Sequence, residues 1–286
     1  MSRADLLYRE TCARILREGV WDTDQSVRPR WADGSPAHTV KCFGVVNRYD
    51  LQEEFPLMTL RRTYWRSCVE ELLAVGPGVT AVIGGGGKTT LLAVLGRELA
   101  AKGRVVLCTT TKIFPFPNLP CARTAEELEA LAGQRLVCTG TVIPETGKLT
   151  VPPVPISALE QEFDYVLVEA DGAAHRPLKA HAPHEPVIPP EASNVILVVG
   201  ASGFGQPISQ AAHRPERYAA LAGAGLEDLV TPELAAAVIR AEGLHDRVYL
   251  NQAETLFRPT DAKTFAQCTG GPVLAGSLQR EEYFVC

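Results

Sequence analysis

A run of four glycines followed by one lysine and two threonines carries the clearest chemical signal in this chain. It occupies residues 84–90 in the string VTAVIGGGGKTT. Glycine lets the backbone curl with its N–H groups turned inward, because no side chain obstructs them. Lys88 adds a cation, and Thr89 adds a hydroxyl group that can bind Mg²⁺. These residue types in this order predict a site for the phosphates of a nucleoside triphosphate.

The flanking residues predict the elements that position this loop. Residues 79–83 are apolar and mostly β-branched, which indicates a buried strand, and residues 91–95 begin an apolar helix. The N-terminus of that helix adds its partial positive charge to the phosphate site. Val82 stands where the usual G-x-x-x-x-G-K-[ST] loop has its first glycine, so this is the shorter G-x-x-G-K-T form, which resembles the loop of the Mur ligases. We expect the nucleotide to be bound by Gly84, Gly85, Gly86, Gly87, Lys88, Thr89 and Thr90.

Two carboxylates end a later apolar strand, in the string DYVLVEADG at residues 164–172. Side chains alternate along a strand, so Glu169 and Asp171 should point to the same face. At the carboxyl end of a parallel strand, both would project toward the nucleotide. One would bind Mg²⁺ and the other would orient a nucleophile, and the pattern leaves that assignment open. We therefore expect Lys88, Glu169 and Asp171 to be catalytic, and Thr89, Glu169 and Asp171 to be the metal ligands.

Basic residues and histidines follow the ends of two predicted strands. Lys112 comes after the strand 104–110, which we expect to lie beside the phosphate-loop strand because sequential parallel strands are usually neighbours. Lys112 should then contact the nucleotide. The loop 175–186 follows the carboxylate strand and supplies the expected substrate residues, which are Arg176, Lys179, His184 and Glu185. The first two suit an anionic second substrate or a leaving phosphate, and the last two suit metal binding or proton relay, although a surface histidine would look the same.

The strand 247–250 ends in the four residues Asn251 to Glu254, with the sequence NQAE. This sequence resembles the N-K-x-D sequence with which G proteins recognise guanine, but it differs at two positions. Gln252 replaces the lysine, and Glu254 is one methylene longer than aspartate. ATP and GTP therefore stay open as alternative ligands.

An alternation of apolar strands and helices from residue 76 onward predicts an α/β, P-loop NTPase-like fold. Such a pattern indicates a mostly parallel sheet with helices on both faces. Residues 1–75 differ and predict a small α+β fragment, with a helix over 5–19, a strand near 39–48 and a helix near 64–73. The predicted domains are thus 1–75 and 76–286. The expected strands of the second domain are 79–83, 104–110, 135–142, 165–170, 195–199, 247–251 and 272–275, and its helices lie near 88–102, 124–132, 213–224, 231–241 and 260–267.

Composition narrows the possible partners and location. The chain has 286 residues, of which 46% are apolar, and a net charge of −5, which argues against a nucleic-acid partner. No apolar stretch is long enough to span a bilayer, so we expect no membrane partner. The charged N-terminus lacks a secretion signal. Eight scattered cysteines contain no C-x-x-C pair, which favours reduced thiols in a cytoplasmic protein.

Residues 4–73 resemble the N-terminal end of thymidylate synthase, above all through FGVVNRYDLQEEFPLMTLR. By that resemblance, Arg28 matches an arginine that grips the nucleotide phosphate, and Glu71 matches a glutamate that assists catalysis. The resemblance stops at Ala74, where the family has tryptophan, and the Pro-Cys-His nucleophile segment does not occur. Covalent attack on the pyrimidine needs that thiolate. We therefore expect no thymidylate synthase activity, and exposed apolar surface or poor order where the rest of the sheet is missing.

Residues 76–286 resemble the YqeC-type selenium cofactor biosynthesis proteins, an accessory family of selenium-dependent hydroxylases. The motifs are GGGGKTT, TTTKIF, DYVLVEADGA, RPLKAHAPHEPVIP, HRPERYAAL, VTPEL and GSLQRE, in the family's order. The resemblance implies an NTPase that uses Mg²⁺ with ATP or GTP and helps to mature a molybdenum hydroxylase. A selenium- or molybdenum-cofactor precursor would be a further partner. Two alternatives stay open: a nucleotide-gated cofactor-binding chaperone with negligible turnover, and mononucleotide binding through residues 4–73.

Overall fold

The computed structural model describes residues 3–23, 26–49, 75–256, 260–271, 273–280 and 282–286. The chain divides into two compact units, residues 1–64 and residues 65–286. The predicted helix near 64–73 lies outside the described residues, and the predicted boundary between residues 75 and 76 stays a prediction.

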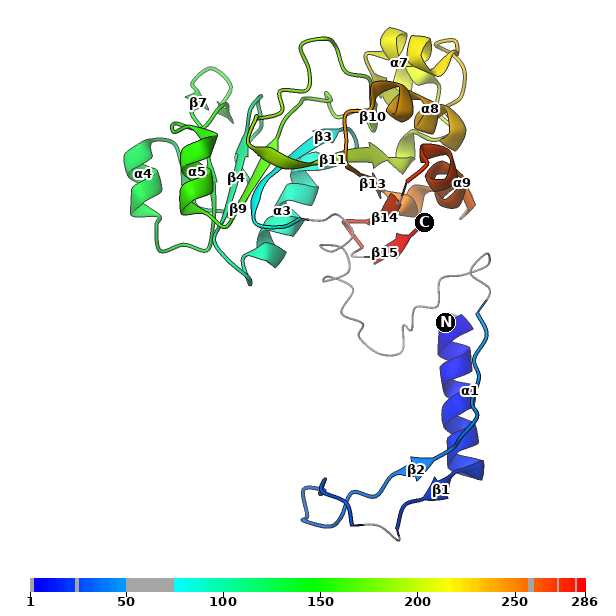
Figure 1. Ribbon diagram of the computed structural model, residues 1–286. Coiled ribbons are helices and arrows are strands. Elements are labelled where there is room, and N and C mark those ends of the chain that lie inside the picture. Colours follow the sequence, from blue (N-terminus) through cyan, green and yellow to red (C-terminus); the bar gives the residue numbers. More distant parts are fainter. Residues whose placement is uncertain (1–2, 24–25, 50–74, 257–259, 272, 281) are drawn as a thin grey trace. The chain divides into compact units, whose positions relative to one another are not determined.

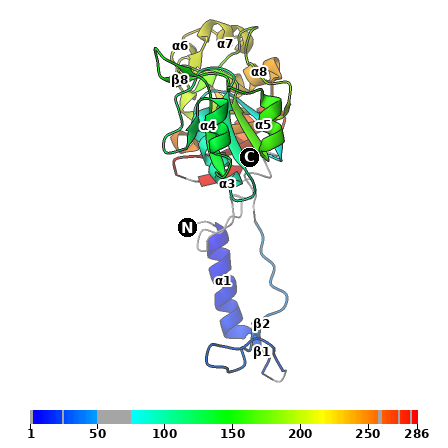
Figure 2. The same cartoon turned by 90° about the vertical axis from the view of Figure 1, so that its left-hand side faces the viewer.

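The first unit is a helix with a short β-ribbon at its C-terminal end (Figure 2). Helix α1 (Arg3–Glu18) confirms the expected helix, and β1 (Val20–Trp21) pairs antiparallel with β2 (Val40–Lys41). The expected strand over 39–48 is wrong beyond Lys41. The chain past that point has no strand partner among the described residues, and Gly44 adopts a φ of +72°, which breaks an extended run.

Large apolar side chains of the first unit are exposed, as expected for a fragment without the rest of its sheet. The exposed fractions are 55% for Trp21, 63% for Trp31, 88% for Phe43 and 77% for Val46. A helix and a two-strand ribbon offer little area against which such side chains can be buried. The prediction of exposed apolar surface is therefore confirmed for residues 3–49.

Nine strands from the described residues of the second unit form its central sheet, in the order β15-β14-β13-β11-β3-β9-β4-β6-β5. Each pair is parallel except β14 with β15, so the prediction of a mostly parallel sheet is confirmed. Every predicted strand and helix of this unit has a counterpart. The elements are β3 (Gly78–Gly84), α3 (Lys88–Leu99), β4 (Val105–Thr109), β5 (Cys121–Ala122), α4 (Ala125–Ala130), β6 (Leu136–Thr139), β7 (Val142–Ile143), β8 (Lys148–Leu149), α5 (Ile156–Glu162), β9 (Tyr165–Glu169), β10 (Leu178–Lys179), β11 (Ala192–Gly200), η1 (Ala201–Gly203), α6 (Ile208–Ala211), β12 (Ala212–His213), α7 (Pro215–Ala222), α8 (Pro232–Glu242), β13 (Arg247–Asn251), η2 (Ala253–Thr255), α9 (Thr260–Thr269), β14 (Val273–Ser277) and β15 (Glu282–Val285).

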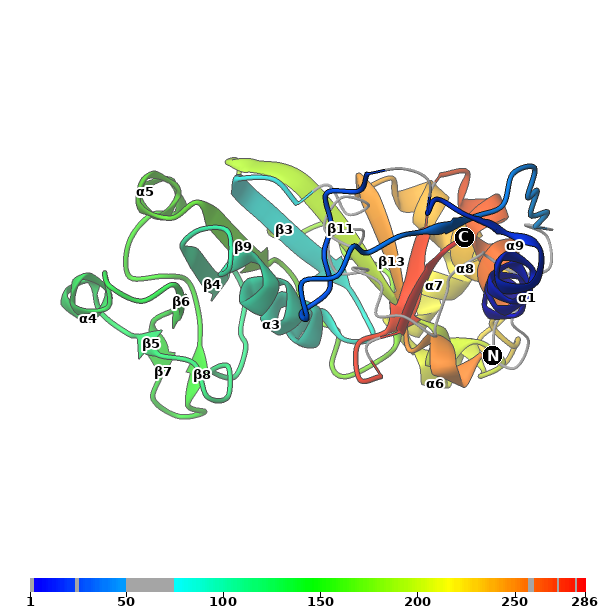
Figure 3. The ribbon, with the colours of Figure 1, turned by 90° about the horizontal axis from the view of Figure 1, so that it is seen from below.

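Helices cover both faces of this sheet. On one face, α3 buries leucines such as Leu91 and Leu95 against Val82 of β3 and Leu167 of β9. On the other face, α5 packs on β9 and β3 near one end of the sheet, and α7, α8 and α9 pack near the other end (Figure 1). The view from below shows α3 and α5 on opposite sides of the strands (Figure 3). Successive strand residues are buried on both faces, which explains their continuous apolar sequences.

The neighbour of the phosphate-loop strand differs from our expectation. We expected the strand 104–110 beside β3, but β9 lies between them and pairs with both β3 and β4. The connection from β3 through α3 passes over one strand position, and the later strand β9 fills it. As a result, the strand that carries the two carboxylates is the direct neighbour of the phosphate-loop strand.

Helix length and hydropathy bear on membrane insertion. Among the described residues, none of the helices has the length and apolar character that crossing a bilayer requires.

Candidate functional site

The glycine-rich loop joins β3 to α3, and its first three N–H groups are already bonded to the protein. Gly84 donates to Asp171 Oδ2 at 2.8 Å, Gly85 to the Val198 carbonyl at 2.9 Å and Gly86 to the Arg176 carbonyl at 3.1 Å. Among the described residues, we find no protein acceptor for the N–H groups of residues 87–90, and no side chain caps α3. The first turn of α3 is therefore the part of the loop that presents donors to an anion.

Close packing against backbone explains why the loop consists of glycine. A Cβ atom on Gly85 would lie 2.7 Å from the Arg176 carbonyl oxygen, and one on Gly86 would lie 2.6 Å from the backbone nitrogen of Gly200. Gly84, Gly86 and Gly87 also have positive φ angles, of 97°, 76° and 123°. The close backbone contacts and the positive φ angles both disfavour any residue other than glycine at these positions. Gly84, Gly85 and Gly86 therefore shape the loop, whereas the N–H groups without an acceptor among the described residues begin at Gly87.

Replacing Gly86 with alanine is expected to lower both the stability of the protein and its affinity for a nucleotide. The new methyl group would overlap Gly200, and overpacking of this kind costs about 1–3 kcal/mol. The matched control is Gly205→Ala, because Gly205 has a similar φ of +78° but open space around its Cβ position. Urea unfolding and nucleotide titration of both variants separate the steric effect from the φ effect. Equal behaviour of the two variants would contradict a packed loop.

Lys88 meets both predicted carboxylates beneath the loop. Its Nζ atom donates to the Gly84 carbonyl at 2.7 Å and lies 3.1 Å from Asp171 Oδ1 and 3.9 Å from Glu169 Oε1. Thr89 donates its hydroxyl hydrogen to Glu169 Oε2 at 2.7 Å. Glu169 ends β9 and Asp171 follows two residues later, and both acids contact the start of α3, as expected from side chains on one face. Of the two, only Glu169 lines a large cavity at the phosphate loop, whereas Asp171 is fully buried beneath the loop.

The two carboxylates have opposite pKa shifts. Burial raises the pKa of Glu169, and the charge of Lys88 and the hydrogen bond from Thr89 oppose that effect only in part. Burial also acts to raise the pKa of Asp171, but the hydrogen bond with His181 and the charges of Lys88 and Lys179 outweigh it and lower the pKa to about 2. Asp171 is therefore an anion fixed by its partners, while Glu169 is the more easily protonated group.

His181 and Glu242 complete a buried network that the sequence did not reveal. His181 is 2% exposed, and its Nε2 and Nδ1 atoms lie 2.7 Å from Asp171 Oδ2 and 2.8 Å from Glu242 Oε2. Glu242 also accepts the backbone N–H of His181 at 2.6 Å. Burial lowers the pKa of His181, but the hydrogen bonds and charges of the two carboxylates raise it above its ordinary value. The network links the phosphate loop to the C-terminal end of α8.

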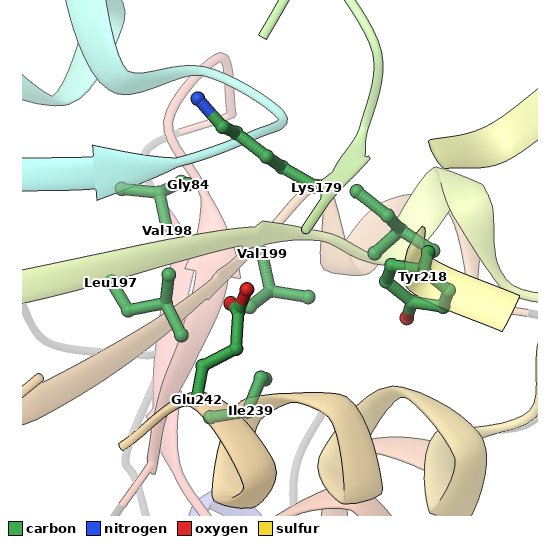
Figure 4. Close-up of a pocket in the computed structure, with 9 residues that line it drawn as sticks. Gly84, Lys179, Leu197, Val198, Val199, Tyr218, Ile239 and Glu242 are labelled. Atoms are coloured by element: carbon green, nitrogen blue, oxygen red, sulfur yellow. The ribbon is translucent and has the colours of Figure 1, made fainter. Parts of the chain in front are cut away.

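A small cavity lies behind this network, with a volume of about 10 Å³, which is close to the space needed by one water molecule. Figure 4 shows Glu242 rising from α8 toward β11, between Leu197 and Val199. Gly84 and Lys179 line the opposite side. This cavity is too small for a substrate. We therefore interpret the network of Asp171, His181 and Glu242 in front of it as a support for the phosphate loop.

The four expected substrate residues occupy different environments. Lys179 is buried and lies 3.3 Å from Asp171 and 2.9 Å from Glu185, which also pairs with Arg214 at 3.1 Å. Arg176 is exposed and lines the large cavity at the phosphate loop, whereas His184 is exposed and is not among its lining residues. The structure therefore brings Lys179 and Glu185 together as an internal ion pair and places Arg176 at the cavity.

A cavity of about 570 Å³ opens above the loop. Its lining includes the expected nucleotide-binding residues Lys88, Thr89 and Thr90 together with Glu169. Further basic residues at its edges are Lys112, Lys148 and Arg176. The lining is basic although the chain carries a net charge of −5, which favours an anionic ligand.

Asn251 is hydrogen-bonded to the phosphate loop and is not among the residues that line the cavity. Its Nδ2 atom donates to the Gly86 carbonyl at 2.7 Å, and its Oδ1 atom accepts the Leu278 N–H at 3.3 Å. The next residue, Gln252, lines the cavity and accepts a hydrogen bond from Ser202 at 2.7 Å. The asparagine of the NQAE sequence, which resembles N-K-x-D, therefore holds the phosphate loop in place by a hydrogen bond.

The donor set suits a divalent ion that is held mainly by phosphate and water. The described residues contain no cluster of three or more His, Cys, Asp or Glu side chains arranged to hold a metal. Thr89 and Glu169 supply two oxygen donors at the start of α3. Mg²⁺ in nucleotide sites usually has one or two protein ligands, with phosphate and water oxygens as the others. These residues fit Mg²⁺ bound together with a nucleotide.

Two family models match the chain. The model of the YqeC protein matches residues 80–216, and the model of thymidylate synthase matches residues 6–82. Both agree with the resemblances inferred from the sequence motifs. The YqeC match covers the phosphate loop, both carboxylates and the loop that contains His181.

Individual proteins similar to this chain also fall into two groups, YqeC and thymidylate synthase. The YqeC protein of Escherichia coli (strain K12) is 38% identical over 157 residues, which are 51% of this chain and 61% of that protein. Thymidylate synthase of Streptococcus pneumoniae (strain 70585) is 38% identical over 74 residues, 26% of either chain. The chain thus spans about three fifths of the first relative and about a quarter of the second.

A search of solved structures finds the Signal Recognition Particle 54 kDa protein of Aeropyrum pernix in complex with GDP. The match has a TM-score of 0.36 and 16% identity, and it covers 74% of this chain and 44% of that one. The strand order and the loop between β3 and α3 show a P-loop NTPase-like fold on their own. Residues 80–216 are a YqeC family segment, and residues 6–82, which overlap it by three residues, are a thymidylate synthase segment.

Proposed function

We propose that this protein binds and hydrolyses a nucleoside triphosphate with Mg²⁺, as an accessory protein for maturing selenium-dependent molybdenum hydroxylases. The observation that carries the nucleotide part is the start of α3. There, Lys88, the Thr89 hydroxyl and N–H groups that have no acceptor among the described residues face a basic cavity. The pathway part rests on the YqeC family segment. Its partners would be a cofactor precursor that contains selenium or molybdenum, and the hydroxylase itself.

The contacts favour a division of labour between the two carboxylates. Glu169 lines the cavity and bonds to Thr89, so we assign Mg²⁺ to Glu169 and Thr89. Asp171 is fully buried and holds Gly84, Lys88 and His181, so we assign it the positioning of the loop and of Lys88. Lys88 would exchange its bond to the Gly84 carbonyl for the β- and γ-phosphates.

The remaining expected residues receive roles that follow from their surroundings. Arg176 and Lys112 lie at the cavity and would contact anionic groups. Lys179 and Glu185 would support Asp171 through their ion pair. His184 lies on the exposed loop, outside the set of residues that lines the cavity.

One observation favours the second candidate, a nucleotide-gated cofactor chaperone with negligible turnover. Asp171 has four partners and a pKa of about 2, which makes it a poor base for activating water. Glu169 is occupied by Thr89 and would bind the metal. Slow hydrolysis with tight binding would therefore fit the site. Mononucleotide binding through residues 4–73 stays a prediction, since Glu71 lies outside the described residues, and dUMP titration would test it.

Titrating the full chain with ATP and with GTP, each with Mg²⁺ and with EDTA, tests the proposal. Because Asn251 is already bonded to the loop, we expect the two affinities to differ by less than about tenfold. EDTA should weaken both, because Thr89 and Glu169 would hold a metal ion whose charge would offset that of the phosphates. Phosphate release in the same samples distinguishes turnover from gated binding. Failure of both nucleotides to bind would overturn the proposal.

A further inference from the structure

Two lysines and an aromatic ring form one wall of the large cavity. Lys112, Phe114 and Lys148 line the cavity there, and the Lys148 Nζ atom lies 4.9 Å from the centre of the Phe114 ring. Phe114 is 58% exposed, although its neighbours Ile113 and Phe116 are 5% and 3% exposed. An exposed ring with cations beside it offers a flat apolar face and positive charge to the same ligand.

The backbone beneath this wall is fixed. Ile113 and Leu149 exchange two backbone hydrogen bonds, of 3.0 and 2.7 Å, which attach the segment after β4 to β8. Ile113, Phe116 and Leu149 all belong to the core on the α3 face. The backbone that carries the wall is therefore preorganised, so a ligand would have to order only the side chains on binding.

The wall lies on the terminal-phosphate side of the proposed nucleotide. Thr89 and Glu169 lie toward β9, and in sites of this type the metal joins the β- and γ-phosphates. Asn251 and Gln252 lie on the other side of the loop, at the end of β13. The nucleoside would extend toward Gln252, and the γ-phosphate would face β4, the strand that leads to Lys112.

The width of the cavity leaves room for a second molecule. Its lining extends from Gln252, after β13, to Lys112, after β4, and these strands are four positions apart in the sheet. At about 4.8 Å per strand, the span is roughly 19 Å. The phosphate loop lies in its middle, which leaves about two strand spacings between β3 and the wall.

We propose that Lys112, Phe114 and Lys148 bind a second substrate, an anionic compound with a planar ring, next to the γ-phosphate. The inference rests on the proposed function for the placement of the triphosphate. It adds the chemical class of the second substrate and assigns three residues to it. Phe114 stacks on the ring, and the two lysines pair with the negative group.

The test uses phenyl phosphate as a probe, titrated by NMR into the full chain loaded with Mg²⁺ and a non-hydrolysable triphosphate. We expect binding in the range of about 1 mM, with inorganic phosphate weaker and phenol undetected, because the wall needs both the ring and the charge. Phe114→Ala and Lys148→Met should each weaken the probe by about threefold or more while leaving triphosphate affinity unchanged. The control Arg97→Met changes an exposed cation on α3, away from the cavity lining.

Three outcomes would overturn this inference. The first is no binding of phenyl phosphate up to about ten times the expected dissociation constant. The second is displacement of the bound triphosphate by the probe. The third is a loss of triphosphate affinity in Phe114→Ala, which would show that the ring contacts the nucleobase. The proposed function fails separately, if the triphosphate itself does not bind to the wild-type chain.

Discussion

Replacing Lys88 with alanine is expected to reduce kcat/KM for triphosphate hydrolysis by at least about 100-fold. Lys88 is the cation at the start of α3, and removing one preorganised group that stabilises developing negative charge costs about 10²–10³ in rate. Triphosphate affinity should also fall, because the same amine contacts the ground-state phosphates. Phosphate release at several substrate concentrations, together with nucleotide titration, measures both effects.

The control is Arg97→Ala, which removes an exposed cation from the same helix. A complication is that Lys88 is the partner of Asp171 Oδ1, so its loss leaves a buried carboxylate oxygen without its cation. The double variant Lys88→Ala/Asp171→Asn removes that charge and keeps the test valid if the single variant unfolds. Equal hydrolysis by wild type and a folded Lys88 variant would contradict the NTPase proposal.

The phosphate loop was predictable because its chemistry is local in the sequence. A buried strand, four glycines, a lysine and a helix follow one another, so no distant contact is needed to recognise them. The role of the individual glycines was not predictable. Gly86 is crowded by Gly200, and Gly87 by Asn251, and these residues are more than 100 positions away in the chain.

The neighbour of β3 could not be read from the order of the strands. Strands that follow one another in the sequence usually lie side by side, which would place β4 beside β3. Here β9 lies between them. The pattern of Glu169 and Asp171 still gave the correct face, since alternation along a strand does not depend on which strand lies beside it. Side-chain direction was therefore predictable where strand position was not.

The choice among the histidines shows a similar limit. The sequence favoured His184, whereas the structure places His181 in the buried network. A local signal existed, because His181 lies between Ala180 and Ala182, while His184 follows a proline in a polar stretch. Glu242, the second partner of His181, is 61 positions away and follows no pattern that links it to the site.

Replacing His181 with leucine is expected to destabilise the protein by about 3 kcal/mol, because it removes the group between the buried Asp171 carboxylate and the half-buried Glu242 carboxylate. His181→Gln should lose less, since an amide can still donate one hydrogen bond. The matched controls are His184→Leu and His184→Gln, on the exposed part of the same loop, which should each change stability by less than about 0.5 kcal/mol. Urea unfolding of the four variants measures these differences.

The pH dependence of the same measurement identifies the charged form of His181. Its folded pKa is raised, so its stabilisation is complete below the unfolded value of 6.5 and is lost as pH rises through the folded pKa. The stability difference between wild type and His181→Gln should therefore shrink above neutral pH. Asp171 acts in the opposite direction: its pKa is lowered to about 2, so its stabilisation is lost as pH falls from about 4 toward 2. A difference between wild type and His181→Gln that stays constant from pH 6 to pH 9 would contradict an imidazolium between Asp171 and Glu242, and would indicate a neutral histidine that only fills space.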